Sequence, residues 1–198
     1  MKSIDDDDWK PLVAFHGHIC PGLAVGARAV AIGLRELGGS PQSLRIVAET
    51  AMCSVDAVQH LTGCTLGNGD LVFRDHGKNA FTFVRLSDGR SVRVLALPDA
   101  LPPDAEHAQL RQKADQGIAS DAERARYVER HRARTQMILD LPEGQLFSVT
   151  TKDGPAVLVS ERTQEAVNCG RCGETVMRTR SVTVEDGFLC IPCCPTQP

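Results

Sequence analysis

The chain has 198 residues, of which 42% are hydrophobic and 24% are charged, and its formal net charge is −3. This length suits one ordinary domain with a small appendage, and the composition is typical of a folded globular protein rather than a disordered one. The weak negative charge excludes a global basic field that would draw the protein to nucleic acid or to an anionic membrane.

The N-terminus carries a run of four aspartates, Asp5–Asp8, which is the opposite of the basic start and apolar stretch of an export signal. No apolar run approaches the roughly 20 residues that a membrane helix needs. The sequence therefore predicts a cytoplasmic protein in which the aspartates form a solvated tail. In a reducing compartment, the eight cysteines favour metal binding or catalysis over disulfides.

A cluster of histidine and cysteine follows at residues 16–22 (HGHICPG). In an extended backbone His16, His18 and Cys20 point to the same side, where two imidazoles and a thiol suit zinc or another late transition metal. Cys20 directly precedes Pro21, so we expect it at the N-cap of a helix whose dipole favours the thiolate. The alternative is structural, with a capping cysteine and packed histidines.

Hydrophobic patterning and turn signals predict the remaining elements of the main domain. We expect helices at 21–37 and 54–61, strands at 44–50, 71–73, 80–86 and 91–97, two helices within 104–139 divided near Gly117, and strands at 146–151 and 156–159. Ser120 with Glu123 matches a capping box at the start of the second charged helix. Helices and strands mix without regular alternation, which predicts an α+β fold with a mixed or antiparallel sheet.

A second group of candidate ligands surrounds the helix predicted at 54–61. On a helix Cys53, Asp56, His60 and Cys64 form one stripe. Cys64 also opens a loop at 64–69 (CTLGNG) whose backbone N–H groups could bind an anion. Taken alone, Cys53 and Cys64 would be small core residues, because free cysteine is often buried. The preceding His/Cys cluster favours the ligand interpretation.

Two close cysteine pairs near the C-terminus predict a zinc-binding module. The pairs are separated by 17 residues and consist of Cys169, Cys172, Cys190 and Cys193. This spacing suits tetrahedral zinc, and Asp186-Gly187 between the pairs is a hairpin signal, which together predict a zinc ribbon. Four buried or redox cysteines are the alternative, but the segment has too few apolar residues to fold without a metal. Cys194 is an additional thiol that could replace Cys193.

These motifs together resemble the FmdE family, named for one of the subunits of formylmethanofuran dehydrogenase. The matching features are residues 15–22 (FHGHICPG), Cys53 with Asp56 and Gln59, residues 62–69 (TGCTLGNG), and Gly77-Lys78 followed by Ala80-Phe81. The resemblance spans roughly residues 10–150. It implies an α+β domain with a His/Cys pocket, often dimeric, in one-carbon or molybdenum/tungsten metabolism, and many members carry a C-terminal zinc module. His76 stands where the family has an aromatic residue.

The leading hypothesis is a metal-dependent protein with a main domain at 1–160 and a zinc ribbon at 161–198. Its second transition metal, with zinc among the candidates, would lie in the N-terminal pocket and act on a small-molecule substrate by activating water or polarising a carbonyl. The predicted ligands there are His16, His18, Cys20, Cys53 and Cys64, and the predicted catalytic groups are Cys20, Cys64, Asp56 and Lys78.

Three alternatives remain from the sequence. The chain could be a non-catalytic accessory subunit, in which the ribbon and the charged helices at 104–139 dock a larger molybdenum or tungsten oxidoreductase. It could carry out reversible thiol redox chemistry through Cys20 and Cys64. The ribbon could bind nucleic acid, although acidic residues offset its arginines and aromatic residues are scarce. The resemblance also implies a homodimer.

Overall fold

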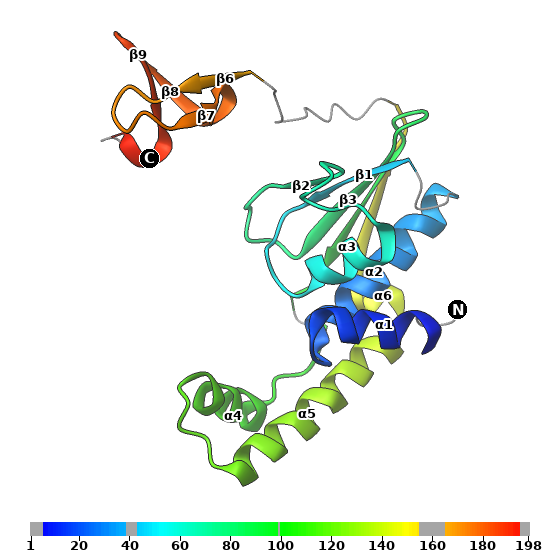
Figure 1. Ribbon diagram of the computed structural model, residues 1–198. Coiled ribbons are helices and arrows are strands. Elements are labelled where there is room, and N and C mark those ends of the chain that lie inside the picture. Colours follow the sequence, from blue (N-terminus) through cyan, green and yellow to red (C-terminus); the bar gives the residue numbers. More distant parts are fainter. Residues whose placement is uncertain (1–5, 39–42, 99, 155–164, 195–198) are drawn as a thin grey trace. The chain divides into compact units, whose positions relative to one another are not determined.

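The computed structural model describes residues 6–38, 43–98, 100–154 and 165–194 (Figure 1). The chain divides into two compact units, residues 1–157 and residues 158–198, and each is considered by itself. The domain boundary predicted at 160/161 and the strand predicted at 156–159 lie outside the described residues. The predicted α+β class is confirmed, because a mixed five-stranded sheet packs with helices in the first unit.

The sheet has the strand order β2-β1-β3-β4-β5. Its strands are β1 (Leu44–Ala48), β2 (Leu71–Phe73), β3 (Ala80–Arg85), β4 (Ser91–Ala96) and β5 (Phe147–Lys152). β1 and β2 run parallel, and every other neighbouring pair is antiparallel. The buried side chains of one face, such as Ile46, Phe83 and Val94, join α2 in the main core.

Helix α2 (Pro21–Leu37) lies against both α3 (Ser54–Thr62) and the sheet. Two of its glycines permit this close approach. A Cβ atom at Gly26 would stand 2.3 Å from the Ser54 carbonyl oxygen, and one at Gly33 would stand 2.5 Å from the ring of Phe83. The small residues of this helix therefore set the spacing between α2, α3 and β3.

Gly26→Ala is expected to destabilise the first unit by about 1–3 kcal/mol or more, because a backbone oxygen cannot move aside as a flexible side chain could. Gly144→Ala is the matched control: its Cβ would meet nothing within 4 Å on the short helix α6 (Glu143–Leu146). Trp9, the single tryptophan, packs against the core and reports denaturant unfolding of this unit by fluorescence. Equal unfolding midpoints for the two variants would contradict this account of the helix spacing.

An additional helix, α1 (Asp6–His16), replaces the solvated tail expected for the aspartate run. Asp7 and Asp8 lie in its first turn, where the helix dipole favours negative charge. The opposite face buries Leu12 completely and Trp9 partly against the residues of α2 and α3. The apolar spacing of these two side chains, rather than the aspartates, decides the local structure.

The charged segment forms a helical hairpin of α4 (Ala105–Asp115) and α5 (Asp121–Asp140), with the predicted break at Gly117, whose φ is 72°. The capping box of Ser120 and Glu123 is confirmed. Figure 1 shows α4 and the first half of α5 extending away from the sheet. The last turns of α5 attach to α2, since Arg28 donates to the carbonyl oxygens of Ile138 (2.7 Å) and Leu141 (2.5 Å).

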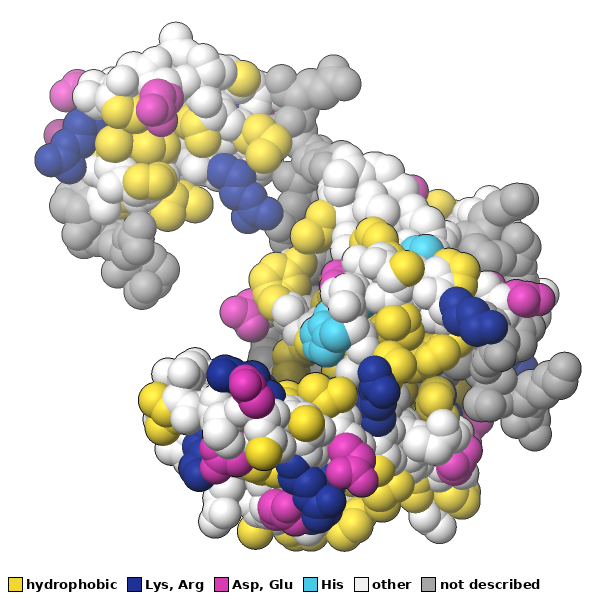
Figure 2. All heavy atoms as spheres, turned by 60° about the horizontal axis from the view of Figure 1, so that its bottom comes forward, with side chains coloured by type: hydrophobic (Ala, Val, Ile, Leu, Met, Phe, Trp, Pro, Cys, Tyr) yellow, Lys and Arg dark blue, Asp and Glu magenta, His cyan; other side chains and the backbone are white. Residues whose placement is uncertain are grey.

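Ion pairs rather than apolar contacts hold most of the hairpin together. Arg130 pairs with Asp104 (3.1 Å) and with Glu106 (2.8 Å), and Arg126 also pairs with Glu106 (3.0 Å). Figure 2 shows side chains of both signs intermingled over these helices. Among the helices that the structure describes, none combines the length and apolarity needed to cross a bilayer.

The second unit contains two small antiparallel sheets. β6 (Ala166–Asn168) pairs with β7 (Thr175–Met177), and β8 (Ser181–Val184) pairs with β9 (Gly187–Cys190). The hairpin predicted at Asp186-Gly187 is confirmed. One turn of 3₁₀ helix at Arg178–Arg180 separates β7 from β8, and another, Ile191–Cys193, follows β9.

Candidate metal centre

Three helix ends bring histidine and cysteine together in the first unit. His16 is the last residue of α1, Cys20 is the N-cap of α2, and Cys53 is the N-cap of α3. One ligand atom from each lies within 4.8 Å of the other two. Gly22 allows this approach, because a Cβ atom there would stand only 3.1 Å from the Cβ of Cys53. We call His16, Cys20 and Cys53 the first ligand group.

The extended backbone expected for residues 16–20 is not what brings these side chains together. The Gly17 N–H closes the end of α1 on the Val13 carbonyl at 2.8 Å, and Gly17 then turns the chain with a φ of 93°. Only Cys20 has clearly extended angles, with φ −149° and ψ 156°. The helix end and the turn, rather than strand alternation, place His16 and His18 on either side of Cys20.

The ring of His16 is held between a carboxylate and a thiol. Its Nδ1 lies 2.7 Å from Oδ2 of Asp56, and its Nε2 lies 3.5 Å from Sγ of Cys20. A carboxylate can only accept a hydrogen bond, so this contact places the proton on Nδ1 and directs the lone pair of Nε2 toward the thiol. Metal-binding histidines in proteins have this same outer partner, which fixes the tautomer and the ring orientation.

The Cys20 thiol accepts a hydrogen bond from the Leu23 N–H at 3.3 Å, which confirms its predicted capping position. Burial nevertheless raises the pKa of Cys20 to about 11, and the neighbouring Cys53 thiol raises it further against the lowering effect of the Leu23 N–H. The prediction that the helix terminus favours the thiolate is therefore wrong for the protein alone, because desolvation outweighs the helix dipole. A cation beside the sulfur would reverse this balance.

A second ligand group shares Cys20 with the first. It consists of His18, Cys20 and His131, whose ligand atoms also lie within 4.8 Å of one another. His131 comes from α5, and its Nδ1 lies 2.9 Å from Nε2 of His107 on α4. Burial, followed by the charges of His107 and His18, lowers the pKa of His131 to about 4, so its imidazole is neutral near pH 7. Neutral imidazole is the form that binds metals.

Sequence reasoning missed His131 and its neighbours. His107 stacks against His131 with a 5.2 Å centroid separation, and Tyr127 lies 4.9 Å from the same ring. The available signal was the placement of Tyr127 and His131 four residues apart on a helix of otherwise charged residues, where such a pair shares one face. Their contact with Cys20 depends on how the hairpin folds back, and no local pattern encodes that.

Cys64 lies outside both ligand groups of the described residues. Its side chain is buried in the main core, where Sγ lies 3.6 Å from the Leu44 carbonyl oxygen. The stripe expected with Cys53 does not form, because α3 ends at Thr62 and Gly63 turns the chain with a φ of 70°. The small-core interpretation therefore describes the position of Cys64.

The loop predicted to bind an anion uses its donors internally. The N–H groups of Thr65 and Asp70 both donate to Oδ1 of Asn68, and the Asn68 N–H donates to Oγ1 of Thr65. Leu66 N–H donates to the Gln59 side chain. These bonds make a rigid turn rather than an anion cradle.

Two other predicted positions are also away from the ligand groups. Lys78 is exposed in the loop before β3, and its N–H donates to the Glu49 carbonyl. His76 pairs with the nearly buried Glu49 (3.2 Å), which also receives two hydrogen bonds from Arg93. Arg93 and then His76 lower the pKa of Glu49 against the effect of burial, so this cluster is a paired ionic network at the sheet edge.

A cavity of about 480 Å³ opens beside the first ligand group. His16, Cys53 and Asp56 lie on its polar side. Its other lining residues are mainly apolar and include Met52, Val55, Leu66, Leu71 and Phe73. Since Asp56 keeps 39% of its side chain exposed, a molecule in the cavity could reach its carboxylate.

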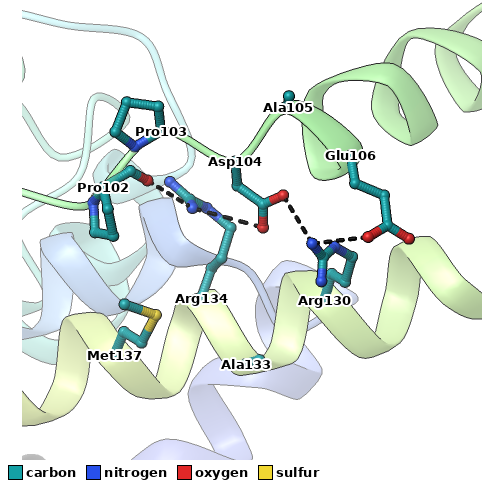
Figure 3. Close-up of a pocket in the computed structure, with 9 residues that line it drawn as sticks. All are labelled: Pro102, Pro103, Asp104, Ala105, Glu106, Arg130, Ala133, Arg134 and Met137. Carbon is teal, nitrogen blue, oxygen red and sulfur yellow. Dashed lines mark hydrogen bonds and ion pairs between the residues drawn. The ribbon is translucent and has the colours of Figure 1, made fainter.

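A second cavity, of about 530 Å³, lies between α5 and the start of α4 (Figure 3). Figure 3 shows Asp104 and Glu106 directed at Arg130, while Arg134 reaches Asp104 and the Pro102 carbonyl oxygen. The charged side chains of this cavity thus pair with one another and close the hairpin.

The second unit brings together all four predicted zinc ligands, Cys169, Cys172, Cys190 and Cys193. The Cys190 N–H donates to Sγ of Cys169 at 3.3 Å. Backbone N–H groups of Cys172, Cys190 and Arg171 lower the pKa of Cys169 to about 6, which favours the metal-binding thiolate. This group contains Cys193 rather than Cys194, and it fits a zinc ribbon.

Comparison with known proteins agrees with this architecture. The family model described as "FmdE, Molybdenum formylmethanofuran dehydrogenase operon" matches residues 15–148, which include both ligand groups of the first unit. A crystal structure of an FmdE-like protein of tungsten formylmethanofuran dehydrogenase from Syntrophus aciditrophicus aligns with a TM-score of 0.57. The alignment covers 98% of this chain and 96% of that chain at 22% identity, so it supports the fold.

A curated relative from Archaeoglobus fulgidus is 35% identical over 193 residues and is described as a probable S-adenosyl-L-methionine-binding protein. The match covers 90% of this chain and 50% of that protein. The present chain therefore spans about half the length of this relative.

Proposed function

Because the chain belongs to the FmdE family, we propose that its first unit is a metal-binding domain that serves formylmethanofuran-type or related molybdenum/tungsten metabolism. The supporting observation is His16, which lies between the Asp56 carboxylate and the Cys20 thiol. This arrangement prepares a nitrogen ligand beside two sulfur ligands and gives it the outer partner that metal-binding histidines use.

The proposed ligands of the metal are His16, Cys20 and Cys53. One nitrogen and two sulfurs suit zinc or another late transition metal, and three protein ligands leave a position for water or substrate. When bound, such an ion would act as a Lewis acid toward a carbonyl or a water molecule. Asp56 orients His16, and its exposed oxygen can take up or release a proton in the adjoining cavity.

The surrounding assembly is also part of this proposal. We propose that the four cysteines of the second unit bind zinc, that the protein works in the reducing cytoplasm, and that it forms a homodimer. The family description, which names a formylmethanofuran dehydrogenase operon, supports a larger enzyme as the partner of this chain.

Asp56→Asn is expected to weaken metal binding in the first unit by about 10–100-fold, because the amide no longer fixes the His16 tautomer as a carboxylate does. Competition with a chromophoric chelator, using Zn²⁺ and the full chain under anaerobic conditions, measures this affinity. Asp70→Asn is the matched control, since Asp70 makes only a 3.7 Å pair with Arg45 away from the site. Unchanged affinity in Asp56→Asn, or zinc bound only by the second unit, would overturn the proposed centre.

A second candidate function is that of a non-catalytic accessory subunit, which the charged hairpin supports. The ion pairs of α4 and α5 leave many charged side chains exposed in both signs, as an interface with a polar partner requires. Salt-sensitive co-elution of the native protein with a molybdenum or tungsten oxidoreductase would favour this role. Activity of the purified chain alone would favour the catalytic one.

The cavity also provides a test of a named ligand. Its apolar wall and the Asp56 carboxylate suit a molecule with an aromatic base and a positive charge, and the Archaeoglobus relative is described as binding S-adenosyl-L-methionine. Calorimetric titration of the full chain with this compound, repeated with Asp56→Asn, tests binding at this cavity. Equal affinity of the two proteins would place any such site elsewhere.

A further inference from the structure

The second ligand group carries an inference beyond the proposed centre. We propose that His18, Cys20 and His131 bind a second metal ion in the first unit, and that this ion fastens the α4–α5 hairpin to the ends of α1 and α2. The inference rests on the proposed function in one respect, because Cys20 would serve both ions.

The ligand atoms of this group are arranged for coordination. They lie within 4.8 Å of one another and come from the turn after α1, the N-cap of α2 and the middle of α5. Since Nδ1 of His131 is engaged by His107 at 2.9 Å, its free ring nitrogen is Nε2. His107 therefore stands to His131 as Asp56 stands to His16: each occupies the ring nitrogen that does not face the cysteine.

Two ions explain the donors better than one. The two ligand groups share Cys20 and no other residue, so they lie on two sides of the same sulfur. A thiolate has several lone pairs and can bridge two soft or borderline ions. The second group supplies two nitrogens and one sulfur, a set suited to zinc, and the exposed His18 leaves that ion open to water.

The position of His131 makes the second ion structurally important. Leu110 is the single buried side chain of α4, and α5 buries only Thr135 and Ile138, both beyond His131 toward its C-terminus. The outer hairpin thus has few apolar contacts to fix it. His131 stacks with His107 and Tyr127, so binding an ion to His131 would immobilise both helices.

The test compares His131→Ala with His60→Ala in the full chain. His60 is an exposed histidine of α3 that stacks on Phe15, and it belongs to neither group of the described residues. Anaerobic reconstitution with Zn²⁺ followed by elemental analysis gives the metal count. We expect His131→Ala to bind one ion fewer per chain than the unmodified protein and His60→Ala to bind the same number. His18→Ala should behave like His131→Ala, and its exposed position makes a folding defect an inadequate explanation.

Hydrogen exchange provides a second readout. Zn²⁺ should slow amide exchange in α4 and the first half of α5 in the unmodified protein and in His60→Ala, but not in His131→Ala. Cys53→Ser separates this inference from the proposed centre: it should lose one ion and keep the zinc-dependent protection of the hairpin. An unchanged metal count and unchanged protection in His131→Ala would overturn the second ion. Loss of an ion in His131→Ala but not in Cys53→Ser would overturn the first centre instead.

Discussion

Cys20→Ser is expected to remove all metal from the first unit. Cys20 is the one residue common to both ligand groups, so its replacement takes a thiolate from each. A serine oxygen is a much weaker ligand for zinc than a thiolate. Two remaining donors in each group would not hold the ion against a chelator of ordinary strength.

The same substitution should leave the fold intact. Serine is a preferred N-cap residue, and its oxygen can accept the Leu23 N–H that Sγ accepts at 3.3 Å. Cys64→Ser is the matched control, because it changes a buried cysteine that lies beside the Leu44 carbonyl rather than in a ligand group. Its hydroxyl can donate to that carbonyl.

Anaerobic elemental analysis of the two variants, with Trp9 fluorescence as a check on folding, measures the effect. Co²⁺ substitution adds a spectroscopic test, since sulfur-to-cobalt charge-transfer bands from the first unit should vanish in Cys20→Ser and persist in Cys64→Ser. A folded Cys20→Ser protein with its full metal content would contradict both ligand groups. Loss of metal in Cys64→Ser would return this residue to the site predicted from the sequence.

Removing zinc from the second unit should unfold that unit and leave the first folded. Among the described residues 165–194, the buried ones are Cys169 and Cys190, which are themselves proposed ligands. The strands β6–β9 have three or four residues each, too short to be stable without other support. The binding energy of the metal, about 10–16 kcal/mol in zinc-finger peptides, would therefore supply the folding energy.

Cys190→Ser is the sharpest form of this experiment, with Cys194→Ser as its control. Amides of 165–194 should exchange without protection in Cys190→Ser and keep their protection in Cys194→Ser. The Trp9 unfolding transition should be the same in both proteins, because Trp9 belongs to the core of the first unit. Protected amides in Cys190→Ser would mean that the unit folds without a metal.

The sequence predicts best those features whose cause is local. Pro21 after Cys20 marks the start of α2, Ser120 with Glu123 marks that of α5, and the spacing of the C-terminal cysteines indicates one tetrahedral group. Each signal depends on backbone chemistry within a few residues. The strands are likewise recognisable from short apolar runs between turns.

The features that sequence reasoning missed depend on packing between distant segments. α1 was hidden by its aspartates, although Trp9 and Leu12 bury its inner face. Cys64 follows a helix on which the spacing indicates a ligand stripe, but the turn at Gly63 directs it into the core. His131 reaches Cys20 only because α5 returns along α2, and the charged sequence of α5 does not indicate which face is inward.

The close packing of α2 on α3 has a consequence for the choice of metal. Cys20 and Cys53 cap these two helices, so the distance between their sulfurs depends on how far apart the helix axes lie. That distance is set at Gly26, where a Cβ atom would meet the Ser54 backbone. Ion size in the first ligand group is thus selected by a glycine that touches no ligand, and a methyl group there should shift the preference of the site toward larger ions.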